Sequence, residues 1–257
     1  MLLTVVQKSV CQIKIKIMKD IKVSFTSTEQ DVYEIRSWID YPDSSMGTVY
    51  SCYKNNSLII ATLDNKVIAY YALIVNEISM FISLAEVKKE FRNKGVGKII
   101  LNEIEKQFYN TQYKTLYLYC SPQESQLYWK KIGFEYFPEN SRKNRNEKIY
   151  MFKIINPILE NIDHNHIRNA DEQEYLEVWN DKSSFVEDTS ANWVWKLDFI
   201  GSNSRVLKFP FLFFGDNHWK IRWSKGDKII KECDYKYFDR KNEIYECMFI
   251  DRMPDFS

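Results

Sequence analysis

Several features that would assign a function at once are missing from this sequence of 257 residues. It has no run of the eighteen or more apolar residues that a membrane-spanning helix needs. Lysine and arginine number 36 against 35 aspartates and glutamates, so no overall field attracts nucleic acid or an anionic membrane. The apolar start, residues 1–6, is too short for a signal-peptide core and follows no basic segment. We expect a soluble cytoplasmic protein with neither nucleic acid nor a membrane among its partners.

Metal and disulfide signals are also lacking. The five cysteines are scattered without a C-x-x-C spacing, which indicates free thiols in a reducing compartment. Cys120 ends a predicted strand, and we interpret it as a buried structural thiol. His164 and His166 form an H-x-H pair without an evident third ligand, so a polar linker is favoured over a metal site. No metal is expected.

The most informative stretch is residues 86–98, which read Glu-Val-Lys-Lys-Glu-Phe-Arg-Asn-Lys-Gly-Val-Gly-Lys. A strand-like run at residues 78–87 leads into it, and an amphipathic helix ending near residue 108 follows. Backbone N–H groups at a helix start have no partner within the helix, and glycine lets an anion approach them. Lys94 and Lys98 add positive charge at the same point. The pattern predicts a phosphate-binding loop.

This loop fits neither of two common phosphate motifs. The G-x-x-x-x-G-K-[ST] spacing of a P-loop is absent, and no third glycine completes a dinucleotide fingerprint. The pattern Arg92-x-x-Gly95-x-Gly97 resembles the pyrophosphate-binding motif of the GNAT superfamily of N-acetyltransferases. Downstream, Leu-Tyr-Trp-Lys-Lys-Ile-Gly-Phe at residues 127–134 resembles the terminal signature of that family, a tyrosine-containing helix end followed by Gly-Phe. The resemblance covers about residues 20–155.

The resemblance implies acetyl-CoA as the acyl donor. Backbone N–H groups from Asn93 to Lys98 would bind its pyrophosphate. The backbone of residues 84–87 would pair with the pantetheine like an added strand and polarise the thioester carbonyl. The donor-binding residues implied in this way are Leu84, Ala85, Val87, Arg92, Asn93, Lys94, Gly95, Val96, Gly97, Lys98 and Trp129.

The catalytic base is less clearly indicated. Relatives often carry a carboxylate or histidine nine or eleven residues before the motif arginine, and those positions are Ser83 and Phe81 here. Neither is a strong base. Glu86 and Glu77, which we expect on the same strand, are the alternatives, acting directly or through water. For each of them, a solvated charge at a strand end is the favoured alternative to a catalytic role.

The acid is also displaced from the family pattern. The tyrosine position four residues before the glycine of Gly-Phe holds Trp129, whose indole N–H is too weak an acid to protonate a thiolate. Tyr128 is adjacent but lies about 100° around the helix, so it acts either as the acid or in packing. Pro122 stands where relatives often carry a pantetheine-binding asparagine. The candidate catalytic residues are therefore Glu86, Tyr128 and Ser83.

The predicted fold class is α/β, an α+β mixed sheet of the GNAT type with a smaller antiparallel β-rich C-terminal domain. The predicted strands of the first part are residues 21–25, 58–63, 66–75, 78–87, 115–120 and 147–155. A tight turn at Asp64-Asn65 joins the second and third. Capping boxes predict helix starts at Ser27 with Gln30 and at Ser121 with Glu124, where Pro122 is the first helical residue and the helix runs to residue 131. Residues 41–53 are polar and turn-rich.

The C-terminal part matches no family that we recognise. We predict a helix at residues 171–179, followed by strands at 193–200, 205–214, 218–223, 228–233 and 244–250. Trp193, Trp195, Trp219 and Trp223 alternate along strands, which favours an aromatic core over a ligand-binding aromatic surface. The predicted organisation is residues 1–17 as an extension or edge strand, 18–155 as the GNAT-like domain, 156–170 as a linker and 171–257 as the C-terminal domain.

These observations predict an N-acetyltransferase that transfers an acetyl group from acetyl-CoA by direct attack in a ternary complex. The acceptor is an amine of unknown identity, either a small molecule or a protein amino group, and a homodimer stays open. One alternative is a regulatory protein that binds coenzyme A with little or no turnover. Another places the function in the C-terminal part, which would recognise a protein or glycan partner.

Overall fold

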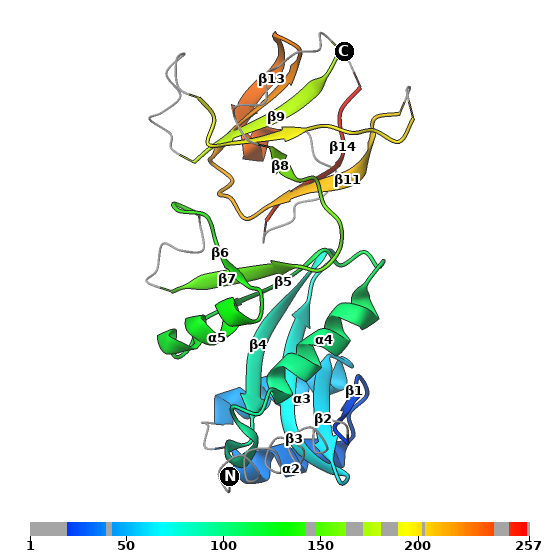
Figure 1. Cartoon of the computed structure of the whole chain (residues 1–257), viewed down its shortest axis with the longest axis vertical. Coiled ribbons are helices and arrows are strands. Elements are labelled where there is room, and N and C mark those ends of the chain that lie inside the picture. The colour runs from blue at the N-terminus through cyan, green and yellow to red at the C-terminus, as the bar shows by residue number, and fades with distance from the viewer. Residues whose placement is uncertain are drawn as a thin grey trace, which may run out of the picture. The chain divides into compact units, whose positions relative to one another are not determined.

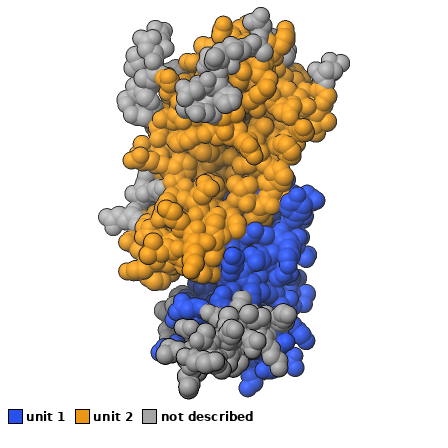
Figure 2. Space-filling model, viewed as in Figure 1, with its two compact units in different colours: residues 1–118 blue, residues 119–257 orange. Residues whose placement is uncertain are grey.

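The computed structural model describes residues 20–39, 43–141, 148–162, 172–180, 190–201, 204–238 and 247–255. The expectations for residues 1–17, for most of the linker and for His164 and His166 lie outside these residues. The chain divides into two compact units, Met1–Leu118 and Tyr119–Ser257 (Figure 2). In the part of the chain that is described, no helix is both long and apolar enough to cross a membrane.

The first unit is built on a mixed sheet whose strands follow one another in space in chain order (Figure 1). The strands are β1 (Lys22–Ser24), β2 (Leu58–Leu63), β3 (Lys66–Val75), β4 (Ser79–Val87) and β5 (Thr115–Tyr119). Neighbours pair antiparallel from β1 to β4, and β4 pairs parallel with β5. Asp64 and Asn65 both adopt positive φ, 52° and 59°, as a two-residue hairpin turn requires. The predicted tight turn is confirmed.

Helices cover both faces of this sheet, and two adjacent tyrosines on β3 show which helix covers which face. Successive strand residues point to opposite faces. Tyr70 lies in a core cluster with residues of α2 (Glu29–Trp38) and α3 (Asp43–Lys54). The Tyr71 hydroxyl instead donates a hydrogen bond to the Gly97 carbonyl in α4 (Val96–Phe108), at 3.1 Å. The sheet is therefore sandwiched between α2 and α3 on one face and α4 on the other.

Two expectations for the first unit are wrong. The capping box of α2 uses Thr28 and Asp31 instead of Ser27 and Gln30: the Asp31 carboxylate accepts from the Thr28 N–H at 2.7 Å, while the Asp31 N–H donates to the Thr28 hydroxyl at 3.2 Å. Residues 41–53 are not a turn-rich segment, because α3 begins at Asp43. Its polar residues mask a helical pattern in which Val49 and Cys52, three residues apart, are buried against the sheet.

The second unit begins with a short 3-10 turn, Gln123–Ser125, and α5 (Gln126–Lys131), followed by the antiparallel pair β6 (Glu135–Tyr136) and β7 (Tyr150–Ile154). A five-stranded sheet then has the spatial order β13-β12-β9-β10-β8, and β11 pairs with β14. The bounds of these strands are β8 Asn161–Ile162, β9 Glu174–Trp179, β10 Trp193–Lys196, β11 Val206–Phe213, β12 Lys220–Lys225, β13 Lys228–Asp234 and β14 Met248–Arg252.

Two helix predictions in this unit are corrected. The segment predicted as a helix at 171–179 contains β9, the central strand between β12 and β10, with all six residues buried. Its two carboxylates, Glu174 and Glu177, are buried, and each lies within ion-pair distance of an arginine. Ser121 caps no helix, because α5 begins only at Gln126 and its N-cap makes no side-chain hydrogen bond.

The tryptophans of the second unit form its core, as the alternation along the strands predicts. Trp195, Trp219 and Trp223 are each 2% exposed and share one hydrophobic cluster. Trp193 packs against that cluster and stacks on Trp219 with ring centroids 5.4 Å apart. These rings therefore stabilise the unit and do not form an exposed aromatic surface.

Candidate functional site

The connection between β4 and α4 has the backbone shape that an anion site needs. Asn93 and Gly95 both have positive φ, 59° and 86°, and Gly95 is the N-cap of α4 in the left-handed conformation. An L side chain is strained in that region, which explains why glycine stands at position 95. The first N–H groups of the helix, from Val96 to Lys98, have no acceptor within the helix. These N–H groups line the candidate anion-binding site.

The start of α4, unlike the start of α2, has no side chain that caps its free N–H groups or balances its positive dipole end. The first turn of α2 has a side-chain cap from Thr28 and the acidic residues Glu29 and Asp31. The first turn of α4 has no side-chain cap and no acidic residue. The positive end of the α4 dipole is thus not neutralised by a carboxylate in the first turn of the helix itself, which favours an external anion.

The side chains around this turn are divided between solvent and core. Asn93, Lys94 and Lys98 are exposed, and the Lys94 ammonium lies 5.3 Å from the centroid of the Phe91 ring. Val96 and Gly97 are buried. Within the turn, the predicted donor-binding residues Asn93 to Lys98 therefore lie together, with the lysines at the surface and Val96 anchoring the turn from inside.

The end of β4 provides the second half of the site. Its described pairing with β5 covers only Ser79 to Phe81, whereas its pairing with β3 continues to Val87. The described pairing with β5 thus ends at Phe81, and a ligand that adds as a strand would lie along β4 beyond this residue. A register shift in the β3–β4 pairing leaves Ser83 as an extra residue between the partners Ile82 and Leu84. Sequence reasoning missed this bulge, because no glycine or proline marks it.

Glu86 and Glu77, the two alternative bases, lie in different places. Glu86 is on β4 directly opposite Tyr70, so its side chain is on the sheet face covered by α2 and α3. Glu77 is exposed in the turn before β4, which corrects its expected place on the strand. Glu86 alone is therefore positioned within the strand segment predicted to bind the thioester.

The Glu86 carboxylate is in contact with the motif arginine. Its Oε2 atom lies 3.2 Å from Nη2 of Arg92, and Nε of Arg92 donates to the Val87 carbonyl at 2.9 Å. The Glu86 side chain is 19% exposed and that of Arg92 is 56% exposed. The sequence pattern gave no signal for this contact, because the arginine reaches back six residues onto the strand.

The predicted acid and its neighbour lie on α5, in the second unit. Trp129 is 7% exposed and packs against the Phe134 ring, with centroids 5.1 Å apart. Tyr128 is 41% exposed. The two side chains thus have the different directions that the helical spacing predicts, and Trp129 contributes to packing. Burial raises the pKa of the Cys120 thiol and outweighs a hydrogen bond with Ser125 that lowers it, in agreement with a structural role.

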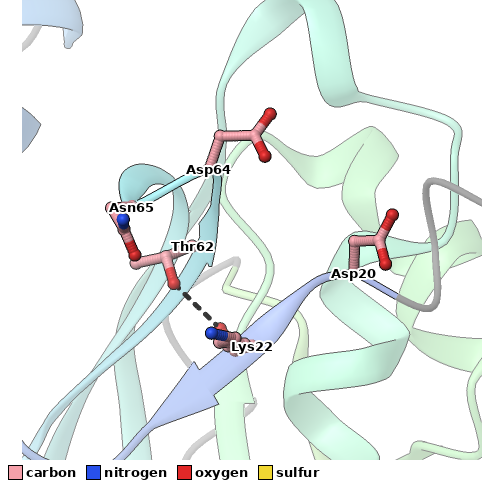
Figure 3. Close-up of a pocket in the computed structure, with 5 residues that line it drawn as sticks. All are labelled: Asp20, Lys22, Thr62, Asp64 and Asn65. Atoms are coloured by element: carbon pink, nitrogen blue, oxygen red, sulfur yellow. Dashed lines mark hydrogen bonds between the residues drawn. The ribbon is translucent and has the colours of Figure 1, made fainter.

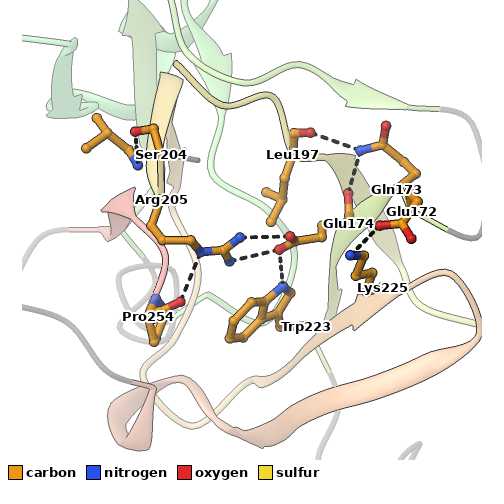
Figure 4. Close-up of polar contacts among 10 residues, drawn as sticks. Glu172, Gln173, Glu174, Leu197, Ser204, Arg205, Trp223, Lys225 and Pro254 are labelled. Carbon is orange, nitrogen blue, oxygen red and sulfur yellow. Dashed lines mark hydrogen bonds and ion pairs between the residues drawn. The ribbon is translucent and has the colours of Figure 1, made fainter. Parts of the chain in front are cut away.

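Among the described residues, two cavities contain no predicted donor-binding residue. A cavity of about 380 Å³ in the first unit is lined by residues of β1 and the β2–β3 turn, where the Thr62 hydroxyl donates to the Lys22 carbonyl (Figure 3). A cavity of about 600 Å³ in the second unit contains Glu174 and Arg205, which form two hydrogen bonds with each other (Figure 4). Within the described residues, no group of three histidine, cysteine or acidic side chains could hold a metal ion.

Comparisons with known proteins agree with this geometry. Residues 18–134 match the model of the acetyltransferase (GNAT) family, and the C-terminal part matches no family model. This segment of the chain is thus a GNAT acetyltransferase domain, which indicates acetyl transfer from acetyl-CoA as its class of chemistry. A search of curated proteins found no match.

Solved structures similar to this chain include several GNAT acetyltransferases, each matching 52% of it. One from Staphylococcus aureus is 15% identical, is covered over 99% of its length and has a TM-score of 0.42. One from Elizabethkingia anophelis with acetyl-CoA bound is 20% identical, covered over 98% and has a TM-score of 0.39. YhbS from Escherichia coli in complex with CoA is 17% identical, covered over 80% and has a TM-score of 0.43.

Proposed function

We propose that this protein is an N-acetyltransferase that transfers the acetyl group of acetyl-CoA directly to an amine within a ternary complex. The observation that carries the proposal is the uncapped start of α4 behind the left-handed Gly95. Together with the family match over residues 18–134, it supports a pyrophosphate-binding turn. The amine belongs either to a small molecule or to a protein.

Donor binding divides between the turn and the strand. Backbone N–H groups from Val96 to Lys98 bind the pyrophosphate, and the ammonium groups of Lys94 and Lys98 add charge–charge attraction. The backbone of β4 beyond Phe81 pairs with the pantetheine as an added strand. An N–H group of this segment polarises the thioester carbonyl and stabilises the negative charge that develops on its oxygen.

The transfer itself needs one base and one acid. The acceptor ammonium loses a proton to Glu86, directly or through a water held near Ser83, and the free amine attacks the thioester carbon. The carbon–sulfur bond breaks, the thiolate takes a proton from an acid, for which the sequence pattern predicts Tyr128, and the products are an amide and coenzyme A. Orientation of amine and thioester in one complex supplies a large part of the rate enhancement.

Calorimetric titration with acetyl-CoA tests the donor site. We expect wild-type protein to bind, and the double variant Gly95→Glu/Gly97→Glu to lose binding, because added side chains and negative charge obstruct the turn. Gly47→Glu is the matched control: Gly47 is an exposed position of α3 whose Cβ would meet no atom within 4 Å. Failure of the folded wild type to bind acetyl-CoA would overturn the proposal.

One observation favours a second function, donor binding without turnover. The buried Trp129 occupies the position where the family signature has the tyrosine that acts as general acid. Release of free thiol from acetyl-CoA in the presence of a panel of amines separates the two functions. Acceptor-dependent release supports the transferase. Binding of acetyl-CoA with no release above the amine-free rate supports a binding protein.

A further inference from the structure

The side chain of Arg92 points back to the strand that precedes it. Arg92 follows the 3-10 turn Lys89–Phe91, and its N–H donates to the Lys89 carbonyl at 3.3 Å. From there the guanidinium reaches the last two residues of β4, Glu86 and Val87. One side chain thus connects the phosphate-binding turn to the strand segment that holds the proposed base.

In its contact with Glu86 and Val87, Arg92 uses the same N–H donors with which an arginine usually binds a phosphate. A guanidinium recognises an oxyanion with two neighbouring N–H groups in a fixed fork. In Arg92, Nε is bonded to the Val87 carbonyl at 2.9 Å and Nη2 to the Glu86 carboxylate at 3.2 Å. The fork that includes Nε is therefore already engaged by the chain. The backbone of the turn and the exposed Lys94 and Lys98 remain for the phosphate groups.

The atoms that Arg92 holds are those whose position matters most to the proposed chemistry. The Glu86 carboxylate is at a strand end, where it has rotational freedom unless a partner fixes it. The Val87 carbonyl belongs to the last residue of β4, and the following N–H, of Lys88, donates to the Ile68 carbonyl at 2.8 Å. Arg92 fixes both the base and the end of the strand relative to the turn.

We infer that Arg92 is a positioning residue for Glu86 and for the end of β4, and that its side chain does not bind the phosphate groups of the donor. The inference rests on the proposed function, since it assigns Glu86 as the base. It corrects the place of Arg92 among the donor-binding residues that the motif implies. A side chain that acts through Glu86 affects turnover, whereas a phosphate ligand affects donor affinity.

The first test measures coenzyme A binding by calorimetry for wild type, Arg92→Gln and Lys98→Gln. We expect Arg92→Gln to retain the wild-type dissociation constant within about twofold, and Lys98→Gln, which loses a charge beside the phosphates, to weaken binding about fivefold to tenfold. A loss of about tenfold or more in Arg92→Gln would overturn the inference while leaving the proposed function intact. No binding by wild type would overturn both.

The second test is a crystal structure of wild-type protein with coenzyme A bound, which needs no acceptor. The inference requires the Arg92 guanidinium to remain within hydrogen-bond distance of Glu86 and Val87. A guanidinium that has left both residues and lies on a phosphate would overturn it.

The third test separates KM from kcat with an amine that supports thiol release. Arg92→Gln should lower kcat about tenfold or more with little change in the KM for acetyl-CoA, and Arg92→Lys should recover part of the loss. In a Glu86→Gln background, Arg92→Gln should cause little further loss, because both changes act through the same carboxylate. An undiminished kcat in Arg92→Gln, or fully additive losses, would contradict the inference.

Discussion

The Tyr71 hydroxyl donates a hydrogen bond to the main-chain carbonyl of Gly97, with 3.1 Å between the two oxygens. Tyr71 is 1% exposed on β3, and Gly97 lies in the first turn of α4. The contact joins the sheet to the turn that carries the candidate phosphate site. It therefore fixes the direction in which the first N–H groups of α4 point.

Tyr71→Phe tests the importance of this bond. The substitution leaves the ring in place but removes the donor to a buried carbonyl, which should lower the free energy of unfolding by about 1–2 kcal/mol. The affinity for acetyl-CoA should fall because the turn becomes less well fixed. Urea denaturation and calorimetry measure the two effects. Tyr33→Phe, at a 58% exposed position of α2, should change neither; an unchanged Tyr71→Phe protein would show that packing alone holds the turn.

Gly95 should be intolerant of even a methyl group. Its φ of 86° lies in the left-handed region, so Gly95→Ala should cost about 1–2 kcal/mol of stability. Gly47→Ala is the opposite case, because Gly47 lies within α3 with open space around it. This substitution should stabilise the helix by about 0.5–1 kcal/mol. Thermal unfolding of the two variants should shift in opposite directions. A shift in the same direction would contradict the assigned backbone conformation at Gly95.

The buried ion pair between Glu174 and Arg205 should dominate the electrostatic contribution to the second unit. Arg205 contacts both Glu174 oxygens at 2.8 and 2.9 Å, and the Trp223 indole N–H donates to the same carboxylate at 2.7 Å (Figure 4). The Arg205 side chain is only 11% exposed, and the Glu174 side chain is only 7% exposed. Glu174→Gln should therefore lower the free energy of unfolding by about 3–5 kcal/mol, because it leaves a buried guanidinium without its counter-charge.

Two controls make that prediction specific. Glu103→Gln breaks the exposed pair with Lys106 on α4 and should cost less than about 0.5 kcal/mol. The double variant Glu174→Gln/Arg205→Met should be less destabilised than Glu174→Gln, since the unpaired charge is removed as well. A double variant at least as unstable as the single one would show that the pair contributes by shape and not by charge compensation. Urea unfolding followed by tryptophan fluorescence provides the measurement.

Phe214, which follows β11, should stabilise the packing of this segment against the β6–β7 segment of the second unit. It is 1% exposed, and its ring centroid lies 4.4 Å from that of Phe137 and 4.6 Å from that of Phe152. Phe214→Ala should cost about 3–5 kcal/mol, whereas Phe209→Ala, at a 39% exposed position of β11, should cost far less. Equal losses in the two variants by denaturant unfolding would contradict this role.

A fragment of residues 157–257 lacks Phe137 and Phe152, so we expect it to be less stable than the whole chain.

The cysteines should differ in reactivity according to their burial. Burial raises the pKa of the Cys52 and Cys120 thiols, while Cys233 is half-buried. A raised folded pKa disfavours the thiolate, so stability is unaffected below the ordinary cysteine pKa of about 8.5 and falls as the pH rises above it. Alkylation of native protein at pH 8, followed by mass spectrometry, should modify Cys233 before Cys52 and Cys120. Modification of Cys120 first would contradict a buried structural thiol.

Local signals in the sequence determined the parts of this protein whose conformation depends on near neighbours. The Asp64-Asn65 hairpin, the helical spacing from Val96 to Phe108 and the glycine at 95 were readable because turn and helix-start chemistry depends on a few adjacent residues. For the same reason the left-handed turn and helix start at residues 93–98, where we propose the donor site, could be predicted from residues 92–98 alone.

Only the tertiary structure decided the features that depend on residues distant in the sequence. β9 is a strand because β10 and β12 flank it and two arginines compensate its buried carboxylates, although its own residues also permit a helix. The bulge at Ser83 exists only in the pairing with β3, and the hold of Arg92 on Glu86 requires the chain to turn back after β4. Pairing register and side-chain direction are set by the packed sheet, so they leave no signal in the local sequence.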